Sequence, residues 1–302
     1  MLCKSQVKDE HITSITVACS GQLLRFKATT FIDATGDADL AYMAGCPIQL
    51  GRESDNRCQP MTLCFRVVNV DTVNWDRDGI QKLYKELQAK GKIKNPRENV
   101  LMFFVPHKNV VHFNSTRVIK HNPVDPLELS KAEALAREQM LELFTMLKEN
   151  FVAFKDATLF NSGISIGVRE SRMIIGKHVL NETELKDCVK FEDRIAAGNY
   201  DIDIHSPDGS GTSHYYFPEG QYYTIPYRSL IPQKINNMLV AGRCISSTHE
   251  AQASYRIMPI VSALGEAAGI AAGVANKAGV DVSDADYKEI QSELLKAGAF
   301  IG

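Results

Sequence analysis

Asn237-Met-Leu-Val-Ala-Gly-Arg-Cys-Ile-Ser246, near the C-terminal end of the chain, predicts a buried strand that runs into a glycine turn. A polar loop follows and leads into Thr248-His-Glu-Ala-Gln-Ala-Ser-Tyr-Arg-Ile-Met-Pro259. Pro259 suits the first turn of a helix, because the amide hydrogen that proline lacks would have no partner there. The order strand, glycine turn, loop and helix is typical of a domain whose backbone comes close to a bound ligand.

A second strand with the same kind of turn lies near the N-terminus, at Phe31-Ile-Asp-Ala-Thr-Gly-Asp-Ala-Asp39. Phe31 to Ala34 predict a short buried strand, and Gly36 allows the chain to turn sharply after it. We expect the two ends of the chain to fold together around one shared ligand. This expectation is wrong if residues 31–39 lie far from residues 240–260.

Residues 257–275 form an apolar run with a single charge, Glu266, and with glycines and alanines at four-residue spacing. Small residues at this spacing also mark dimers of membrane-spanning helices. Gly279, however, predicts a left-handed cap after a soluble helix, and no other segment is comparably apolar. We therefore expect a buried helix of a soluble protein, whose small side chains let a sheet or a flat ligand approach closely.

The composition is that of an ordinary globular protein, with 44% hydrophobic and 23% charged residues in 302. A chain of this length predicts two domains. The formal net charge is −2 and no basic run occurs, which argues against nucleic-acid and membrane partners. The expected partner is a small molecule.

Seven cysteines stand singly, without a C-x-x-C pair, so neither a zinc site nor an iron–sulfur cluster is expected, and no bound metal. The first residues, Met1-Leu-Cys-Lys4, lack the basic and then apolar layout of a secretory signal. The sequence therefore predicts a cytoplasmic protein, provided that the native N-terminus is present.

The remaining segments predict mixed secondary structure without a repeating strand–helix–strand rhythm. Strands are expected at residues 11–19 and 22–28 as a hairpin, and at 100–105 and 110–119 as a pair. Helices are expected at residues 76–90 and 130–150, the second opened by the capping box Ser130-Lys-Ala-Glu133. The middle third is thus a mixed α+β region.

Two polar clusters in the second half of the chain leave alternatives open. Arg169, Glu170 and Arg172 favour a structural ion pair, with the wall of a site as the alternative. In Tyr200-Asp-Ile-Asp-Ile-His205, Asp201, Asp203 and His205 would share one side of a strand, either solvated or as a polar site wall. Metal binding by all three is disfavoured, because positions i and i+4 of a strand lie roughly 13 Å apart.

These segments together resemble the FAD-dependent oxidoreductase family of the glutathione-reductase-like superfamily. The resemblance is carried, in the family's order, by Ala34-Thr-Gly-Asp-Ala-Asp39, Gln59-Pro-Met-Thr62, Gly167-Val-Arg-Glu-Ser-Arg172, Ile202-Asp-Ile-His205, Ile225-Pro-Tyr-Arg228 and the block from Ala241 to Gly269. The matches span nearly the whole chain. The ordered set is specific, whereas Ala-Thr-Gly alone is weak.

The resemblance implies an α/β and α+β fold: an incomplete glutathione-reductase-like FAD-binding domain, made of residues 1–59 and 236–302, with a mixed α+β substrate domain at residues 60–235 inserted. Family members begin with G-x-G-x-x-G, which holds the FAD pyrophosphate at a helix N-terminus, and this chain has no such loop. Either the sequence is the C-terminal portion of a longer enzyme, or a separate polypeptide supplies the nucleotide-binding half. Binding of FAD by this chain alone is therefore doubtful, and a homo-oligomer is the other assembly we expect.

Seven residues are expected to hold the cofactor. The positive end of the helix opened by Pro259 would stabilise charge on the reduced flavin ring, and the neighbouring cation would add to it. The glycines would let the backbone pass close to the phosphate chain. The expected cofactor-binding residues are Thr35, Gly36, Gly242, Arg243, Arg256, Met258 and Pro259.

For the chemistry, His249 is the leading candidate, because it follows the flavin strand in a polar loop and can take a proton from a hydroxyl or amine. Tyr227 and Arg228 would orient the substrate, His205 is a second acid–base candidate, and Glu250 would fix the orientation of its histidine neighbour. The predicted function is transfer of a hydride from a small polar substrate to FAD. The alternative is a redox-inactive binding module, or one subunit of a split flavoenzyme.

Overall fold

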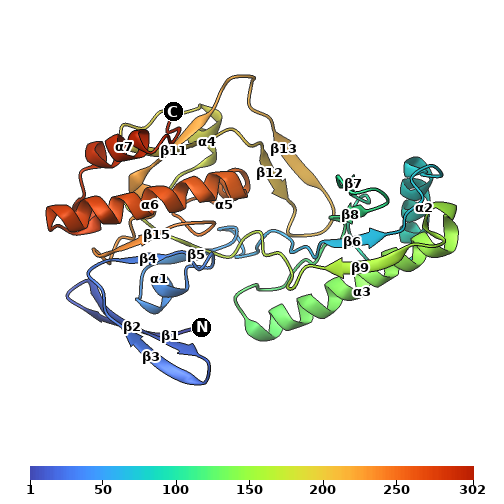
Figure 1. The fold of residues 1–302 in the computed structure, drawn as a ribbon, viewed down its shortest axis with the longest axis horizontal. Helices are drawn as coiled ribbons and strands as arrows, with labels where there is room; N and C mark the ends of the chain where they lie inside the picture. Colours follow the sequence, from blue (N-terminus) through green and yellow to red (C-terminus); the bar gives the residue numbers. More distant parts are fainter. The chain divides into compact units, whose positions relative to one another are not determined.

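The computed structural model describes residues 1–302 and divides the chain into two compact units (Figure 1). Unit 1 comprises Met1–Asn56, Glu170–Ile204 and Ser213–Gly302, and unit 2 comprises Arg57–Arg169 and His205–Thr212. Helices and strands occur in both units, which confirms a mixed α/β fold class. The predicted substrate domain also contained residues 170–204 and 213–235, and these segments belong to unit 1.

The two ends of the chain meet in unit 1. Strand β4 (Phe31–Asp33) pairs in parallel with β15 (Met238–Val240), with Phe31 opposite Met238, and the two strands form a sheet of their own. Both strands are short and, apart from Asp33, apolar, and they lie side by side in Figure 1. The expectation that residues 31–39 and the segment after residue 237 fold together is confirmed.

Helix α6 (Met258–Ala278) follows this sheet. Pro259 lies in its first turn, and Gly279 ends it in the left-handed conformation with φ 70°, as predicted. The helix has the length and apolar composition of a membrane-crossing segment, with a mean hydropathy of 1.5. Its apolar face packs on β11 (Arg194–Gly198) and α7 (Tyr287–Lys296) within unit 1.

Of the small residues of α6, the alanines face the interior and the glycines do not. Gly265, Gly269 and Gly273 lie on the exposed side of the helix, and a Cβ added to any of them would meet no atom within 4 Å. Ala267 and Ala271, each two residues after one of these glycines, are buried instead. The reason is that leucine and alanine already fill the face toward β11, which leaves the glycine stripe on the outside.

The rest of unit 1 consists of small sheets and short helices. Strands β1 (Leu2–Lys8), β2 (His11–Cys19) and β3 (Gln22–Phe26) form an antiparallel sheet, which confirms the predicted hairpin and adds a strand to it. Two further antiparallel pairs join β5 to β10 and β11 to β14. The remaining elements are α1 (Asp39–Met43), β5 (Ile48–Leu50), β10 (Arg172–Ile174), α4 (Glu182–Lys186), β14 (Tyr223–Pro226), η2 (Tyr227–Leu230), α5 (His249–Tyr255) and η3 (Val282–Asp284).

Unit 2 is built on a four-stranded antiparallel sheet. Its order is β7 (Met102–Phe104), β8 (Val111–Phe113), β6 (Phe65–Val68) and β9 (Thr158–Ser162). The inward side chains of the sheet share one apolar core with α2 (Arg77–Ala89), α3 (Pro126–Asn150) and η1 (Val152–Phe154). Strands β12 (Ile202–His205) and β13 (Thr212–Tyr215) form a separate pair, and all their residues except His205 and Thr212 belong to unit 1.

The helix prediction for unit 2 is correct except for one start. α2 matches the predicted range, with Asp76 capping it through the amide of Gly79. α3 begins at Pro126 rather than at Ser130, because the side chain of Asp125 accepts from the amides of Leu127 and Glu128. An Asp-Pro start therefore takes precedence over the later capping box.

Candidate functional site

The turn after β4 is organised by a buried carboxylate, Asp33. Its Oδ1 accepts hydrogen bonds from the amide and the hydroxyl of Thr35 at 3.1 and 2.7 Å, and its Oδ2 accepts from the amide of Ala41 at 2.9 Å. The hydroxyl oxygen of Thr35 also accepts from the amide of Asp39 at 3.0 Å. Thr35, an expected cofactor residue, thus contributes to the shape of the turn with its side chain.

The glycine turns that follow β4 and β15 contact each other. Arg243 Nη2 forms an ion pair with Asp37 Oδ1 at 3.2 Å, and a Cβ on Gly36 would lie only 2.8 Å from that nitrogen. Gly36 has φ 81° and Gly242 has φ 110°, backbone angles that residues with a side chain rarely adopt. Gly36, Gly242 and Arg243 are therefore brought together as the sequence suggested, with Arg243 held by an aspartate.

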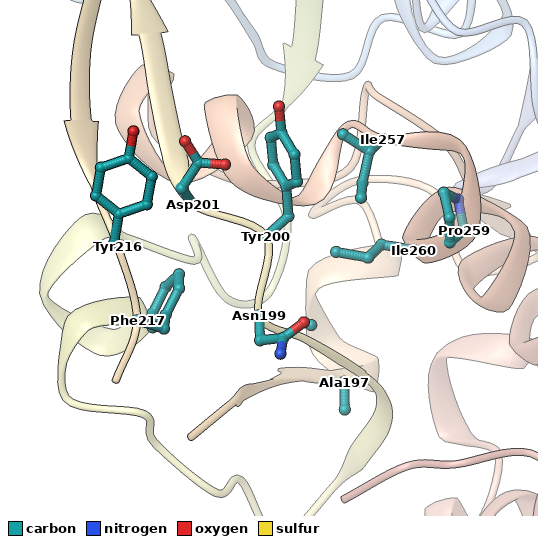
Figure 2. Close-up of a pocket in the computed structure, with 10 residues that line it drawn as sticks. Ala197, Asn199, Tyr200, Asp201, Tyr216, Phe217, Ile257, Pro259 and Ile260 are labelled. Carbon is teal, nitrogen blue, oxygen red and sulfur yellow. The ribbon is translucent and has the colours of Figure 1, made fainter. Parts of the chain in front are cut away.

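A cavity of about 560 Å³ opens at the start of α6 (Figure 2). In Figure 2, the rings of Tyr200, Tyr216 and Phe217 stand on one side, and Ile257, Pro259 and Ile260 from the first turn of α6 stand on the other. The remaining lining residues are Ala197, Gly198, Asn199 and Asp201. The walls are thus mainly flat aromatic and aliphatic surfaces, with a helix N-terminus at one edge.

Arg256 lies directly before this helix and is mostly buried. Its Nη2 lies 3.5 Å from Asp203 Oδ2, whereas its Nε is buried without a hydrogen-bond partner. Burial lowers the pKa of the guanidinium, and the carboxylate of Asp203 partly opposes that effect. Met258, by contrast, is 81% exposed, and only its backbone is fixed by the helix.

These features fit the ring end of a flavin. The N-terminus of α6 has no side-chain cap, so its first amides remain available, and they carry the positive end of the helix dipole. The buried Nε of Arg256 adds an unsatisfied donor close by. Arg256 and the amides of Met258 and Ile260 could therefore face a ring that gains negative charge on reduction, and Pro259, which has no amide hydrogen, contributes only to the start of the helix.

His249 forms the most organised polar contact of unit 1. Its Nδ1 lies 2.7 and 2.8 Å from the two carboxylate oxygens of Glu170, and the side chains are 5% and 0% exposed. Because an ionised carboxylate only accepts, Nδ1 carries the hydrogen of this bond. Nε2 makes no hydrogen bond, so in the neutral ring it presents a lone pair.

His249 lines a cavity of about 630 Å³ in unit 1. The cavity wall comes from the end of β5 and the loop after it, from β10, and from the start of α5, where Thr248 caps the helix. Its lining residues are Gln49, Gly51, Arg52, Glu53, Ser54, Ile174, Ile175, Val179, Ser247, Thr248, His249 and Glu250. A histidine with one nitrogen fixed and the other available beside a cavity can act as a proton acceptor.

The residue that orients His249 is Glu170, not the neighbouring Glu250 of the sequence-based hypothesis. Arg169, Glu170 and Arg172 each contact a different part of the fold, and Glu170 contacts His249. Arg169 donates to the carbonyl of Pro60 at 2.7 Å, and Arg172 pairs with Asp39 Oδ1 at 2.7 Å. The three charges thus serve three different places, because successive residues of an extended segment point in different directions.

Tyr227 and Arg228 lie at a different cavity, of about 410 Å³, and not at that of His249. The buried hydroxyl of Tyr227 donates to the carbonyl of Val282 at 2.7 Å, and burial raises the pKa of the phenol. Arg228 holds both carboxylate oxygens of Asp193, at 2.9 and 3.1 Å. Both side chains are therefore engaged by the fold, in contrast to the predicted substrate contact.

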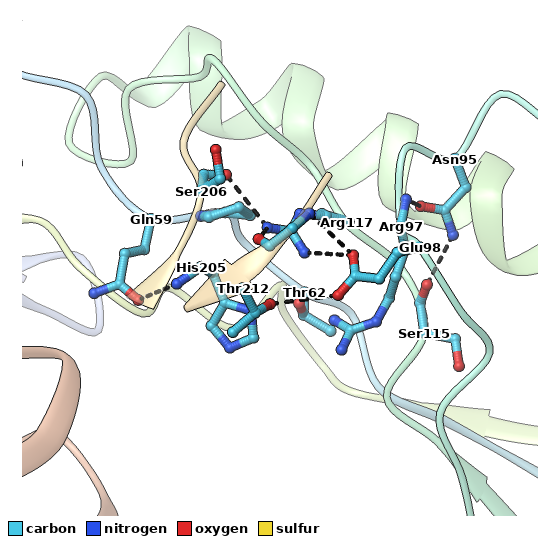
Figure 3. Close-up of polar contacts among 12 residues, drawn as sticks. Gln59, Thr62, Asn95, Arg97, Glu98, Ser115, Arg117, His205, Ser206 and Thr212 are labelled. Carbon is cyan, nitrogen blue, oxygen red and sulfur yellow. Dashed lines mark hydrogen bonds and ion pairs between the residues drawn. The ribbon is translucent and has the colours of Figure 1, made fainter. Parts of the chain in front are cut away.

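His205 belongs to unit 2, where a polar network holds it (Figure 3). The hydroxyl of Thr212 donates to Glu98 Oε1 at 3.3 Å, so its oxygen accepts from His205 Nδ1 at 3.2 Å. Arg117, with a side chain only 1% exposed, donates to Glu98 Oε2 at 3.0 Å and to the carbonyl of Gly211 at 2.7 Å. The loop before β13 is thereby held by an ion pair whose arginine is buried and whose glutamate is partly exposed.

Two of the three polar residues of the Asp201 to His205 segment share a partner, because His214 Nε2 also lies 3.6 Å from Asp203 Oδ1. Asp201 Oδ2 lies 2.6 Å from His214 Nδ1, Asp203 lies beside Arg256, and His205 contacts Thr212. The structure contains no group of three His, Cys, Asp or Glu side chains arranged to hold a metal ion. Their alternation in sequence thus places Asp201 and Asp203 beside one histidine, whereas His205 contacts Thr212.

Sequence reasoning missed Asp33, Glu170 as the partner of His249, and the Glu98–Arg117 pair. Asp33 was within the quoted glycine motif, and a charged residue inside an apolar strand is a usable signal of a structural role. Arg117 gave the same signal, as a cation inside a predicted strand. Glu170 gave none that linked it to His249, because their contact joins distant parts of the sequence.

Comparison with known proteins places this geometry in context. A family model described as FAD dependent oxidoreductase matches residues 1–294. The flavin-dependent brominase Bmp2 is 11% identical with a TM-score of 0.36, over 98% of this chain and 54% of its own. A geranylgeranyl bacteriochlorophyll reductase-like protein from Thermoplasma acidophilum is 11% identical with a TM-score of 0.39, over 99% of this chain and 53% of its own. This chain thus spans about half the length of these structures, and a search of curated proteins gave no match.

Proposed function

Since the chain belongs to the FAD dependent oxidoreductase family, we propose that it moves a hydride from a small polar substrate to flavin, with His249 as the proton acceptor. FAD is the cofactor of this family, as the sequence predicted. The observation that carries the proposal is the His249–Glu170 pair, in which a buried carboxylate fixes one ring nitrogen and leaves the other beside a cavity.

Bound FAD supplies the hydride acceptor of this chemistry. His249 Nε2 takes the proton from the hydroxyl or amine of the substrate while the adjacent carbon is oxidised. Glu170 keeps the hydrogen on Nδ1 and stabilises the imidazolium that forms, because it lies within 2.8 Å of the ring with both oxygens. The burial of Glu170 strengthens this interaction by excluding water.

The cofactor-holding residues of the proposal come from two places in unit 1. The first turn of α6 and Arg256 would receive the pyrimidine edge of the ring, since they offer backbone amides and an unsatisfied donor. The contacting turns at Gly36 and Gly242 would lie beside the phosphate chain, where glycine allows close passage. Thr35 and Arg243 would shape these turns through Asp33 and Asp37.

The finer assignment is an incomplete glutathione-reductase-like domain. It is supported by the absence of a G-x-G-x-x-G motif from the sequence and by a β4–β15 sheet of only two strands. In this proposal the adenosine half of FAD is held by residues outside this sequence, on a longer chain or on a partner. The absence of the G-x-G-x-x-G motif also favours the alternative, a redox-inactive binding module.

The visible spectrum with added FAD separates these alternatives. We expect the protein to bind FAD and to show a resolved flavin absorption spectrum. Small alcohols and amines are then tested as substrates by following the loss of this absorbance in the absence of oxygen. His249→Gln keeps the spectrum and slows bleaching by about 10²–10⁴-fold, because a general base is lost. His11→Gln, a matched change at an exposed histidine, leaves the rate unchanged.

Two results would contradict the proposal. A protein that stays colourless in the presence of FAD, also after addition of a chain that supplies a nucleotide-binding half, favours the binding module. Unchanged bleaching by the His249→Gln variant would remove His249 from the mechanism.

A further inference from the structure

The cavity that His249 lines in unit 1 has both apolar and polar groups in its wall. Ile174, Ile175 and Val179 supply branched aliphatic surface, and Val179 is 40% exposed. The polar groups come from the loop after β5 and from the start of α5. A cavity of about 630 Å³ has the size that small organic ligands need. A molecule with a short branched carbon chain and a polar end matches this lining.

His249 offers a hydrogen-bond acceptor that a molecule in this cavity can reach. Its side chain is 5% exposed, and Glu170 engages only Nδ1 of the ring. Nε2 has no hydrogen bond, and it is not one of the fully enclosed polar atoms that lack a partner, so it keeps accessible surface. Because His249 forms part of the cavity wall, a bound molecule with an N–H or O–H group can supply the missing donor.

The charged groups of the cavity wall favour a cation over an anion. Glu53 and Glu250 line the cavity, and neither carboxylate forms a hydrogen bond or an ion pair. Arg52 is the one arginine or lysine among the lining residues, and its Nε and Nη2 donate to the two carboxylate oxygens of Asp55 at 3.0 and 2.7 Å. A ligand carboxylate would therefore meet like charges beside an arginine that is already paired, whereas an ammonium group would meet opposite charges.

We propose that the substrate is a branched aliphatic amine without a carboxylate, an inference that rests on the proposed redox function and narrows its substrate class. The amine binds as its ammonium form, which predominates at neutral pH as it does for lysine. One of the three N–H groups donates to His249 Nε2, and Glu53 stabilises the positive charge. The carbon chain packs on Ile174 and Val179. An alcohol has one donor and no charge, so it satisfies His249 alone.

The redox step balances for such a substrate. The ammonium group first loses one proton to His249 Nε2, which leaves a lone pair on the nitrogen of the neutral amine. The carbon next to this nitrogen then loses a hydride, with both electrons of its C–H bond, to FAD. The nitrogen lone pair forms the second bond of the C=N product, an iminium ion. The substrate therefore needs at least one hydrogen on the carbon that bears the nitrogen.

The binding experiment uses the full chain without FAD and four probes of similar size. 3-Methylbutylamine carries a cation, 3-methylbutan-1-ol is its neutral analogue, 3-methylbutanoate carries an anion, and leucine joins an ammonium and a carboxylate to the same isobutyl group. Titration calorimetry at about pH 7 measures the four dissociation constants. We expect the amine to bind at least about tenfold more tightly than each of the other three probes, and its affinity to fall as the salt concentration rises.

Variants locate the binding to the cavity of His249. Glu53→Gln weakens the amine about three- to fivefold and leaves the alcohol unchanged, because only charge is removed, and the exposed turn position of Glu53 keeps the variant folded. His249→Gln weakens both the amine and the alcohol, because both lose the Nε2 acceptor. Glu219→Gln, a matched loss of an exposed turn carboxylate elsewhere in unit 1, leaves the binding of both unchanged.

The inference is overturned if the alcohol or the acid binds as tightly as the amine, if the folded wild-type protein binds none of the probes, or if Glu53→Gln keeps the amine affinity of the wild type. Bleaching of the flavin by the alcohol alone overturns it too, and leaves the redox function in place. Selective binding of the amine without bleaching by any alcohol or amine contradicts the redox function instead, and leaves the cation-binding cavity in place.

Discussion

Two histidine–carboxylate pairs of unit 1 have nearly the same length and opposite surroundings. His249 lies 2.7 Å from Glu170, with side chains 5% and 0% exposed. His11 lies 2.8 Å from Asp281, with side chains 38% and 34% exposed. Contact distance alone therefore does not distinguish a candidate catalytic pair from a surface pair.

The two rings differ in how their nitrogens are used. In His11, Nδ1 contacts the carbonyl of Asp9 and Nε2 contacts Asp281, so both nitrogens are engaged and the charged form is favoured. In His249, only Nδ1 is engaged, by Glu170, and Nε2 remains available. His249, buried and with one ring nitrogen free of hydrogen bonds, can act as a base. His11, at the surface and with both nitrogens hydrogen-bonded, instead links two segments of the chain.

The largest effect is expected from breaking the buried pair. Glu170→Leu leaves the hydrogen on Nδ1 of His249 unpaired in the interior, and we expect a loss of about 3–5 kcal/mol in the free energy of unfolding. Urea denaturation measures this loss. Glu170→Gln, which keeps an acceptor, is the control and costs less; equal losses for Leu and Gln would mean that the hydrogen bond is not the cause.

A double-mutant cycle sharpens the comparison. We expect the His249 and Glu170 side chains to couple by about 1–3 kcal/mol, because both are desolvated. The same cycle for His11 and Asp281 gives at most about 1 kcal/mol, since solvent screens that pair. Equal coupling energies, from unfolding of the four variants of each pair, would contradict the role assigned to burial.

The pH dependence of stability is expected to come from the surface pair. The carbonyl of Asp9 and the carboxylate of Asp281 raise the pKa of His11 above its ordinary value of 6.5. The resulting stabilisation is complete below the unfolded-state pKa and is lost as pH rises through the higher folded-state pKa. Because His11 is exposed, it amounts to no more than about 1 kcal/mol.

His11→Gln tests this dependence. Wild type and variant are unfolded in urea between about pH 5.5 and about pH 8.5, and their stability difference should shrink as pH rises. A difference that stays constant over this range would remove His11 as its source.

The smallest effect is expected at Glu250, which the sequence favoured as the orienting residue. Glu250 lies beside the cavity of His249 but is not bonded to its ring, so Glu250→Gln should change stability by less than about 0.5 kcal/mol. The rate of flavin bleaching should also stay near that of the wild type. A large loss of rate would reinstate Glu250 as a participant in the chemistry.

The sequence predicted well wherever a feature depends on neighbouring residues. The strand and glycine turn at Gly242, the cap at Gly279 and the α2 range all follow from local propensity. The meeting of β4 and β15 followed from a family resemblance that joins two motifs. The start of α3 was misplaced because two valid start signals, at Asp125 and Ser130, lie close together.

Side-chain roles were harder to predict, because tertiary partners decide them. Tyr227 and Arg228 have the composition of a substrate rim, yet Val282 and Asp193 engage them. Glu170 is adjacent to two arginines in sequence, but its bond to His249 is formed across the fold. A single sequence contains no signal for such long-range pairs.

The pairing of Phe31 with Met238 has a consequence for synthesis of the chain. Strand β4 leaves the ribosome before its sheet partner β15, which follows at about 5–20 residues per second only after all the residues between them have been made. Most of unit 2 comes from the continuous run Arg57–Arg169 and can collapse during this interval. The nascent N-terminal segment thus has an exposed, unpaired strand edge for many seconds, which makes chaperone binding during translation advantageous.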